Sequence, residues 1–253
     1  MALDEALMMQ LPSSGLPVLR FYRWRSPCLT VGYFQSVPRD IDRERCRESG
    51  IPVVRRPTGG RAIFHDQELT YSLAALESDP LFEGGILRSY ARVSRGLVAG
   101  LRSLGVPAEA IPPRRRPLPD KSPACFDAIA GYEVAVEGRK LVGSAQVRRG
   151  GVALQQGSIL LRVEPEKLFR LLRYADEGSR RRLEASFSRW VASLDQVMDG
   201  LPSVRLLLAA FQRGFRQALG VELVRSQPSP EERASARRLV REKYGQPHWN
   251  LMR

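Results

Sequence analysis

Apolar residues alternate with polar ones in short runs over the first two thirds of the chain, which is typical of strands. Longer stretches with apolar residues at every third or fourth position predict helices, most clearly over residues 85–105. Together they predict an α+β fold with mixed and antiparallel sheets and packing helices. We expect a single domain over residues 1–253, with a helical C-terminal portion at about 165–253. The predicted strands are 17–25, 28–34, 51–54, 62–64, 69–76, 132–136, 140–147 and 152–163, and the predicted helices are 1–10, 38–49, 85–105, 203–219 and 230–244.

A short glycine-containing segment interrupts this pattern and has three arginines next to it. Residues 57–60, PTGG, separate two apolar runs, and successive glycines allow backbone conformations that are closed to other residues. We therefore expect a glycine turn that joins two strands, with Arg55, Arg56 and Arg61 around it. Bare backbone amides and guanidinium groups together suit a carbonyl, a carboxylate or a phosphate. An ordinary hairpin with solvated arginines fits the same residues equally well.

The charge of the chain indicates acidic partners. The 253 residues carry a net charge of +13, and the pI is about 10.4. Such a chain attracts nucleic acid, anionic membranes or acidic proteins. The basic residues are spread out and match no recognised nucleic-acid-binding motif, so we expect no nucleic-acid partner. No segment approaches the roughly 18 apolar residues of a membrane span, so we expect no membrane partner either.

A proline-rich stretch over residues 106–123 predicts an irregular loop. Arg114, Arg115 and Arg116 lie within it. Either a solvated loop or a docking contact for an acidic partner accounts for these three arginines.

The three cysteines, Cys28, Cys46 and Cys125, show no metal-ligand spacing, and a reduced, cytoplasmic setting is the simplest interpretation. Cys28 and Cys46 read as small packing residues. Cys125 follows the proline-rich loop, where a nearby cation would lower its thiol pKa and make it a nucleophile; an inert buried thiol is the alternative. Only four of the 40 basic residues are lysines, and Lys140 lies on a strand that could reach back toward Cys125. Unlike arginine, a desolvated lysine can lose its proton.

Four segments carry a resemblance to a known family. Residues 55–72, RRPTGGRAIFHDQELTYS, and residues 138–146, GRKLVGSAQ, resemble the signatures of the lipoate-protein ligase and octanoyltransferase superfamily, which is related to biotin protein ligases. The segment ACF at 124–126 resembles the acyl-accepting cysteine of its octanoyl-[acyl-carrier-protein]:protein octanoyltransferase branch, and KYxxxxWN at 243–250 looks like the same branch. Relative to the family pattern the chain begins inside the first helix, so we expect a preceding strand to be missing.

The resemblance implies the biotin/lipoate protein ligase catalytic-domain fold and a function. The chain would transfer an octanoyl group from acyl carrier protein to a lysine of a lipoyl domain or glycine-cleavage H protein, through a thioester on Cys125, with Lys140 as its catalytic partner and without a cofactor or metal. His65, next to Asp66, would make a structural hydrogen bond rather than serve as a catalytic base. The expected substrate-binding residues are Arg56, Gly59, Gly60, Arg61, Ile63, Phe64, His65, Val142, Gly143 and Ser144.

Two other functions remain open on the sequence. An ATP-dependent lipoate-protein ligase would form a lipoyl-adenylate and need ATP and Mg²⁺. Cys125 and the arginine at position 61, where those ligases tend to carry a third glycine, argue against it. A nucleic-acid-binding protein is suggested by the charge alone.

Overall fold

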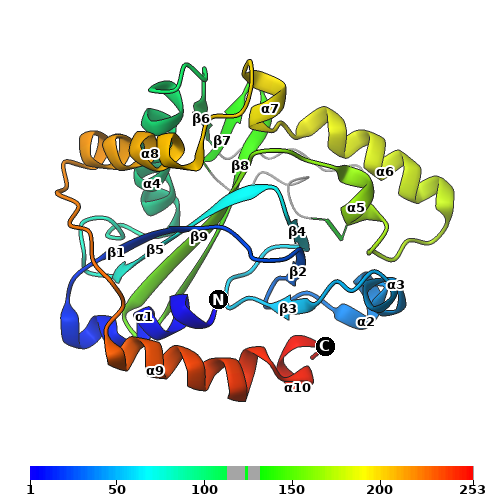
Figure 1. Cartoon of the computed structure of the whole chain (residues 1–253), viewed down its shortest axis with the longest axis horizontal. Coiled ribbons are helices and arrows are strands. Elements are labelled where there is room, and N and C mark those ends of the chain that lie inside the picture. Colours follow the sequence, from blue (N-terminus) through cyan, green and yellow to red (C-terminus); the bar gives the residue numbers. More distant parts are fainter. Residues whose placement is uncertain (113–122, 125–131, 253) are drawn as a thin grey trace.

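The computed structural model describes residues 1–112, 123–124 and 132–252. The predicted nucleophile Cys125 and the arginines at 114–116 lie outside the described residues. Two sheets organise the described part of the chain (Figure 1). A six-stranded antiparallel sheet has the order β1-β5-β9-β8-β7-β6, and a three-stranded mixed sheet has the order β3-β2-β4. The strands are β1 (Val18–Tyr22), β2 (Cys28–Val31), β3 (Val53–Arg55), β4 (Ile63–His65), β5 (Glu68–Leu76), β6 (Glu109–Ile111), β7 (Glu133–Val136), β8 (Arg139–Arg149) and β9 (Val152–Leu160).

Helices cover both sheets, and α5 to α10 follow β9 in the chain. Figure 1 shows α4 and α8 together at one end of the large sheet and α2 and α3 beside the small sheet. The predicted α+β class with mixed and antiparallel sheets is confirmed. The helices are α1 (Ala2–Ser14), α2 (Val37–Asp40), α3 (Arg43–Glu48), α4 (Ile86–Arg102), α5 (Pro165–Phe169), α6 (Glu177–Trp190), α7 (Leu194–Val197), α8 (Val204–Leu219), α9 (Pro230–Leu239) and α10 (Pro247–Asn250), with a π-helical turn η1 (Val240–Tyr244) between the last two.

The main core lies where α4 and α8 pack on the large sheet. Helical spacing puts Val93, Leu97 and Leu101 of α4 on one face, and all three are fully buried. The two helices approach closely because glycines meet at their crossing: a Cβ on Gly214 would lie 2.3 Å from the backbone nitrogen of Gly100. This packing fixes the end of the large sheet that carries β6 and β7.

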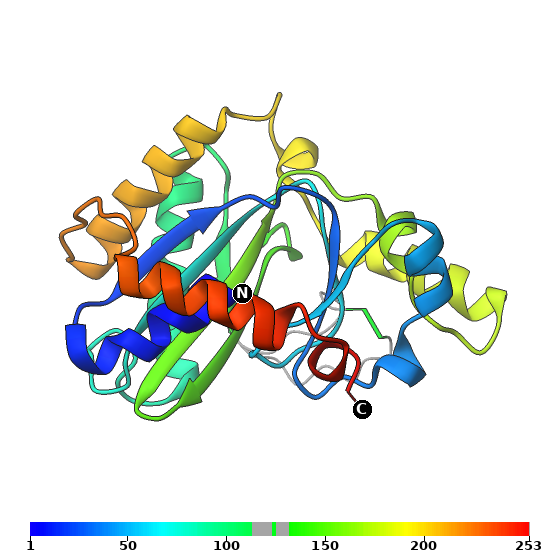
Figure 2. The same ribbon diagram turned by 60° about the horizontal axis from the view of Figure 1, so that its bottom comes forward.

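The C-terminal segment runs back beside the first helix, as Figure 2 shows for α9 and α1. Lys243 Nζ lies 2.6 and 2.7 Å from the two carboxylate oxygens of Glu5, and Tyr244 OH donates to Glu5 at 2.6 Å. Two residues of the KYxxxxWN motif thus hold the C-terminal segment against the N-terminal helix. Burial and the carboxylate of Glu5 raise the pKa of Tyr244 far above its usual value, so its hydroxyl remains a donor.

Arg55 joins the small sheet to the other half of that motif. Its side chain is fully buried, and its guanidinium donates to the carbonyls of Gly32 at 2.7 Å, Gln35 at 2.8 Å and Trp249 at 3.2 Å. Its backbone N–H donates to Asn250 Oδ1 at 3.1 Å, and its carbonyl accepts from Trp249 Nε1 at 2.9 Å. The C-terminal segment is therefore part of the scaffold around β3.

The expected glycine turn does join two strands, β3 and β4. It is not the ordinary hairpin of the alternative interpretation, because β3 and β4 both pair with β2, in parallel and antiparallel directions respectively. Two other local predictions were wrong. The predicted helix 38–49 is two short helices, α2 and α3, separated by Ile41 in extended conformation. The proline-rich stretch is not wholly irregular, since Glu109–Ile111 within it form β6 on the edge of the large sheet.

No helix within the described ranges is long and apolar enough to cross a bilayer.

We expect Arg55→Met to destabilise the fold by about 3 kcal/mol or more, because it leaves several buried carbonyls without donors. Urea unfolding followed by circular dichroism measures this effect. Arg45→Met is the matched control, since Arg45 is exposed on α3, and it should change the free energy of unfolding by about 0.5 kcal/mol at most. Equal stability of the two variants would contradict the scaffold role of Arg55.

Candidate functional site

A cavity of about 150 Å³ lies between the two sheets. One wall is the glycine turn and β4, contributing Thr58, Gly60 and Ile63. The facing wall is the large sheet, where β8 and β9 contribute residues from 140 to 158. Most of the cavity surface is apolar, with a few polar side chains, as small-molecule sites usually are.

The glycine turn is shaped by Arg56. This buried guanidinium donates to the carbonyls of Gly59 at 2.9 Å and Arg61 at 2.7 Å, and so holds the chain on both sides of Gly60. Gly60 has φ +93°, a conformation that residues with a side chain rarely adopt. A Cβ on Gly32 would lie 1.9 Å from the carbonyl oxygen of Gly60, so the turn packs directly on the end of β2. Arg56 is therefore a structural part of the turn as well as a wall of the cavity.

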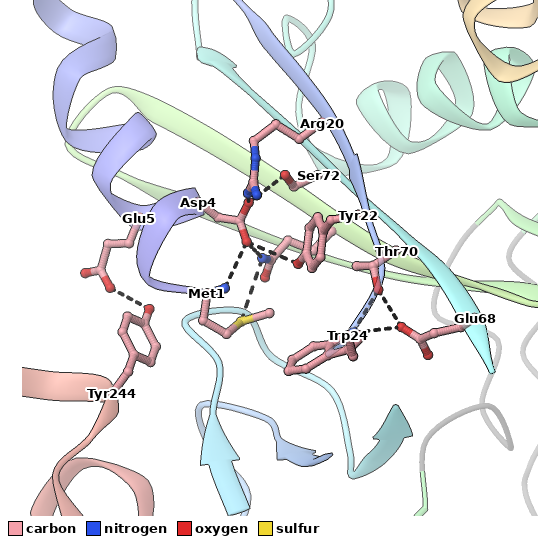
Figure 3. Close-up of polar contacts among 11 residues, drawn as sticks. Met1, Asp4, Glu5, Arg20, Tyr22, Trp24, Glu68, Thr70, Ser72 and Tyr244 are labelled. Carbon is pink, nitrogen blue, oxygen red and sulfur yellow. Dashed lines mark hydrogen bonds and ion pairs between the residues drawn. The ribbon is translucent and has the colours of Figure 1, made fainter. Parts of the chain in front are cut away.

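His65 and Glu68 connect this turn to the large sheet. The ring nitrogens of His65 lie 2.8 Å from Glu68 Oε1 and 2.7 Å from Thr30 Oγ1, and Arg56 donates to the same Thr30 oxygen at 3.1 Å. Trp24 stacks on His65 and donates to Glu68 at 3.1 Å, and Figure 3 shows Glu68 held by Trp24 and Thr70. A hydrogen-bonded chain thus runs from β5 to the glycine turn.

The Glu68 carboxylate is the charged centre of that chain. Burial alone would raise the pKa of Glu68, but the charge of His65 and hydrogen bonds from His65, Ser158 and Thr70 lower it below the usual value. Glu68 therefore stays ionised and holds the imidazole of His65 in place. The partner of His65 is Glu68 and not Asp66, which instead forms an ion pair with Lys167 at 3.2 Å.

Lys140 lies at one end of the cavity, on β8. Its Nζ is 2.9 Å from Glu133 Oε1 on the neighbouring strand β7, and both side chains are almost completely buried. The ion pair holds a positive charge inside the cavity wall, and a charge in this setting acts more strongly than it would in water. The carbonyl of Lys140 also accepts from the backbone N–H of Ala192, which fixes this end of β8 from behind.

A second buried carboxylate lies at the other end. Asp4 of α1 accepts hydrogen bonds from Ser72 at 2.7 Å, Tyr22 at 3.2 Å and Gln156 at 2.9 Å, and it pairs with Arg20 (Figure 3). Burial opposes its ionisation, but the N-terminal ammonium and Arg20 keep the pKa of Asp4 lowered. Sequence reasoning missed this cluster, although an acidic residue among the apolar residues of the first helix was a signal for it.

Most of the predicted site residues are brought together at the cavity. Those that line it are Arg56, Gly60, Arg61, Ile63, His65, Lys140, Gly143 and Ser144. A hydrogen bond of 2.7 Å joins the hydroxyl of Tyr71 on β5 to that of Ser144 on β8. Burial raises the pKa of Tyr71 to about 12.

Three predicted residues are not on the cavity wall. Gly59 presents its carbonyl to Arg56, Phe64 lines a separate cavity of about 40 Å³, and Val142 is fully buried in the main core. The reason for Val142 is that its side chain packs among those of the large sheet and α4, while its neighbours Gly143 and Ser144 reach the cavity.

The segment just before Cys125 is described and lies beside the glycine turn. Ala124 pairs with Ala62, and the carbonyl of Pro123 accepts from the backbone of Ala62 at 3.1 Å and from Gln35 Nε2 at 2.9 Å.

Burial raises the pKa values of the other two thiols, to about 12 for Cys28 and about 11 for Cys46, which agrees with their predicted packing role. Within the part of the chain that the structure describes, no group of His, Cys, Asp and Glu is arranged to hold a metal ion.

Comparison with known proteins gives the class of this protein. Residues 1–216 match the family described as the lipoyl protein ligase A/B catalytic domain, and the chain belongs to this family. The sequence is 41% identical to the octanoyltransferase LipM of Carboxydothermus hydrogenoformans over 98% of this chain and 92% of that protein. It is 44% identical to the octanoyltransferase LipM of Kyrpidia tusciae over 99% of this chain and 93% of that protein.

Two solved structures of lipoate protein ligases share the fold of this chain. A bi-partite lipoate protein ligase from Thermoplasma acidophilum has a TM-score of 0.83 and 28% identity, over 100% of this chain and 91% of that one. A lipoate-protein ligase A bound with ATP has a TM-score of 0.80 and 25% identity, over 99% of this chain and 92% of that one. The predicted superfamily, its fold and the enzyme class, an acyltransferase of the octanoyltransferase type, are therefore confirmed.

The contact between Gly32 and Gly60 gives a test of the turn. Gly32→Ala should destabilise the fold by about 1–3 kcal/mol, because the new methyl group overlaps a backbone carbonyl. Gly59→Ala is the matched control: nothing lies within 4 Å of the added Cβ, so we expect a change within about 1 kcal/mol. Both values come from thermal unfolding. If both variants are equally stable, the close packing of the turn on β2 is wrong.

Proposed function

We propose that the protein transfers an octanoyl group from acyl carrier protein to a lysine of a lipoyl domain or glycine-cleavage H protein, through an octanoyl thioester on Cys125. The observation that carries the proposal is the buried Lys140–Glu133 ion pair at the end of an apolar cavity, facing the glycine turn. The relatives named octanoyltransferase support the octanoyl group as the one transferred.

The proposed reaction has two acyl transfers. First, the Cys125 thiolate attacks the carbonyl of the octanoyl thioester, a new carbon–sulfur bond forms, and the carrier thiolate leaves and takes up a proton. Second, the ε-amine of the acceptor lysine attacks the octanoyl-Cys125 thioester, a carbon–nitrogen bond forms and the carbon–sulfur bond to Cys125 breaks. The proton lost by the amine is taken up by the released Cys125 thiolate. The thioester supplies the driving force, so we propose that neither ATP nor a metal is needed.

The described residues would contribute charge and position. Lys140, kept as an ammonium by Glu133, would stabilise the thiolate and the oxyanion that develops on the acyl carbonyl. Backbone N–H groups near Gly59–Gly60 or Gly143–Ser144 would donate to the same oxyanion. The apolar cavity would hold the acyl chain, at about 0.8 kcal/mol per buried methylene.

The net charge of +13 would serve protein docking. Acidic carrier proteins and lipoyl domains would be attracted over long distances, and salt would screen that attraction. We propose the arginine-rich loop at 114–116, which lies outside the described residues, as one contact.

Cys125→Ser should abolish octanoyl transfer, because a serine hydroxyl does not become an anion near neutral pH as a cysteine thiol does. Intact-mass analysis of the wild-type chain mixed with octanoyl carrier protein should show one octanoyl adduct, and the variant should show none. Transfer by the serine variant at the wild-type rate would contradict the thioester mechanism. Acceptor modification only with ATP and free octanoate would instead establish the ligase function.

Lys140→Arg should lower kcat/KM for octanoyl transfer by about 100-fold or more. The longer, planar guanidinium does not fit the buried position beside Glu133, so its charge would be misplaced relative to the thiolate and the oxyanion. Lys167→Arg is the control, since Lys167 is exposed and lies outside this cavity, and its rate should stay within about twofold of wild type. The pH dependence of Cys125 alkylation adds a direct test: an unchanged thiol pKa in Lys140→Ala would refute Lys140 as the partner of the thiolate.

A further inference from the structure

The two packed helices α4 and α8 contain arginines but no acidic residue. Every other arginine-containing helix of the described ranges also contains an aspartate or a glutamate, as α6 does, where Arg180 lies 2.6 Å from Glu177. The arginines of α4 and α8 form no ion pair with any residue that the structure describes. They are Arg88, Arg92, Arg95 and Arg102 of α4 and Arg205, Arg213 and Arg216 of α8.

These arginines lie on the outer sides of the two helices. In α4 they follow the helical spacing i, i+4, i+7 and i+14, opposite the buried Val93, Leu97 and Leu101. All of them are exposed except Arg92, which is half-buried. Since α4 and α8 pack closely on each other (Figure 1), the two rows of arginines form one surface, the basic face.

The charge of the basic face is unfavourable in the chain alone. Arg88 and Arg92, and likewise Arg92 and Arg95, are like charges one helical turn apart, and such pairs destabilise a helix. The net charge of +13 adds to this repulsion. An acidic partner would relieve the repulsion, and its complementary charge would steer its approach to this face.

Two apolar side chains border the basic face. Ile86 and Leu87, in the first turn of α4, are 53% and 51% exposed. The phosphates of a nucleic acid offer no apolar contact to such side chains, whereas a protein surface does. The combination of exposed arginines with exposed apolar residues therefore favours an acidic protein as the partner.

The basic face and the cavity lie on opposite sides of the large sheet. Tyr71 and Ile159 pack in the main core with α4 and α8, whereas their neighbours in sequence, Thr70 and Ser158, line the cavity. Successive residues of a strand face opposite sides of a sheet. A partner on the basic face must therefore deliver its reacting group around the edge of the sheet.

This position suits the donor better than the acceptor. A carrier protein holds its octanoyl group on a flexible prosthetic arm, whereas the acceptor lysine is a single side chain of a folded domain. Helix α4 also fixes the chain that follows Cys125, because Ser94 Oγ donates to the carbonyl of Tyr132 at 2.6 Å, and Tyr132 is the first described residue after Cys125.

We propose that the basic face of α4 and α8 binds the acidic acyl carrier protein while it delivers the octanoyl group. This inference rests on the proposed function and adds to it the surface that the donor contacts.

The test combines Arg88→Gln, Arg95→Gln and Arg213→Gln, because these exposed side chains make no hydrogen bond to other described residues. Calorimetry with carrier protein that bears no octanoyl group should show a Kd raised by about fivefold or more at about 0.05 M ionic strength. At about 0.5 M the difference from wild type should disappear, because salt screens the attraction. Transfer from a short octanoyl thioester without carrier protein should stay within about twofold of wild type, whereas kcat/KM for octanoyl carrier protein should fall by the same factor as the affinity.

The matched control combines Arg45→Gln, Arg47→Gln and Arg181→Gln. It removes the same charge from ion-paired, exposed arginines of α3 and α6, so its affinity for the carrier protein should stay within about twofold of wild type. Equal weakening in both combined variants would mean that net charge alone acts and would overturn the inference. Unchanged binding in the basic-face variant would overturn it as well.

The same proteins are titrated with a lipoyl domain, with duplex RNA and with vesicles of anionic lipid. If the basic-face variant loses at least as much affinity for one of these as for the carrier protein, the assignment of the face to the donor is wrong. Carrier binding that depends on the basic face, without any octanoyl transfer to Cys125, would refute the proposed function and leave the docking surface standing.

Discussion

Two buried guanidinium groups impose the constraint on which the site depends. Arg55 and Arg56 follow one another at the end of β3, and a charged group removed from water must have its donors satisfied. Arg55 directs its donors to Gly32, Gln35 and the C-terminal segment, whereas Arg56 directs its donors to both sides of Gly60. One dipeptide therefore fixes the chain just after β2, the glycine turn and the C-terminal segment beside the small sheet. The contact of 1.9 Å that a Cβ on Gly32 would make is a direct result of this close arrangement.

The rest of the cavity wall is fixed by polar groups that support one another. Glu68 orients His65, His65 contacts Thr30, and Thr30 accepts from Arg56, so the large sheet and the glycine turn form one hydrogen-bonded unit. On the facing wall, Glu133 holds Lys140 in place. Groups that are already oriented before a substrate arrives need not be reorganised during the reaction, and this preorganisation is how electrostatic catalysis gains most of its effect.

Periodicity predicted most strands and helices but not how they are connected. The apolar stripe of α4 was long enough to specify a helix, and the largely apolar runs of β5 and β9 were long enough to specify strands. The strands on either side of the glycine turn have only three residues each, and a pattern that short does not determine a pairing partner, which is why the sequence left a hairpin open as an alternative. Val142 was misplaced because strict alternation would put it on the same side of β8 as Lys140, whereas the pairing of β8 with β7 shifts register between these two residues. Asp4 and Gln156 lie 152 positions apart, so no local pattern could join them.

The bond between Arg55 and Trp249 spans 194 positions of sequence, and this separation has a consequence for biosynthesis. At about 5–20 residues per second, a ribosome needs roughly 10–40 s to reach residue 249 after it has made β3. During that interval the nascent chain contains the complete glycine turn but lacks the last acceptors of its buried arginine. The small sheet therefore reaches its final form only when synthesis of the C-terminal segment is nearly finished, and until then the guanidinium of Arg55 lacks part of its acceptors.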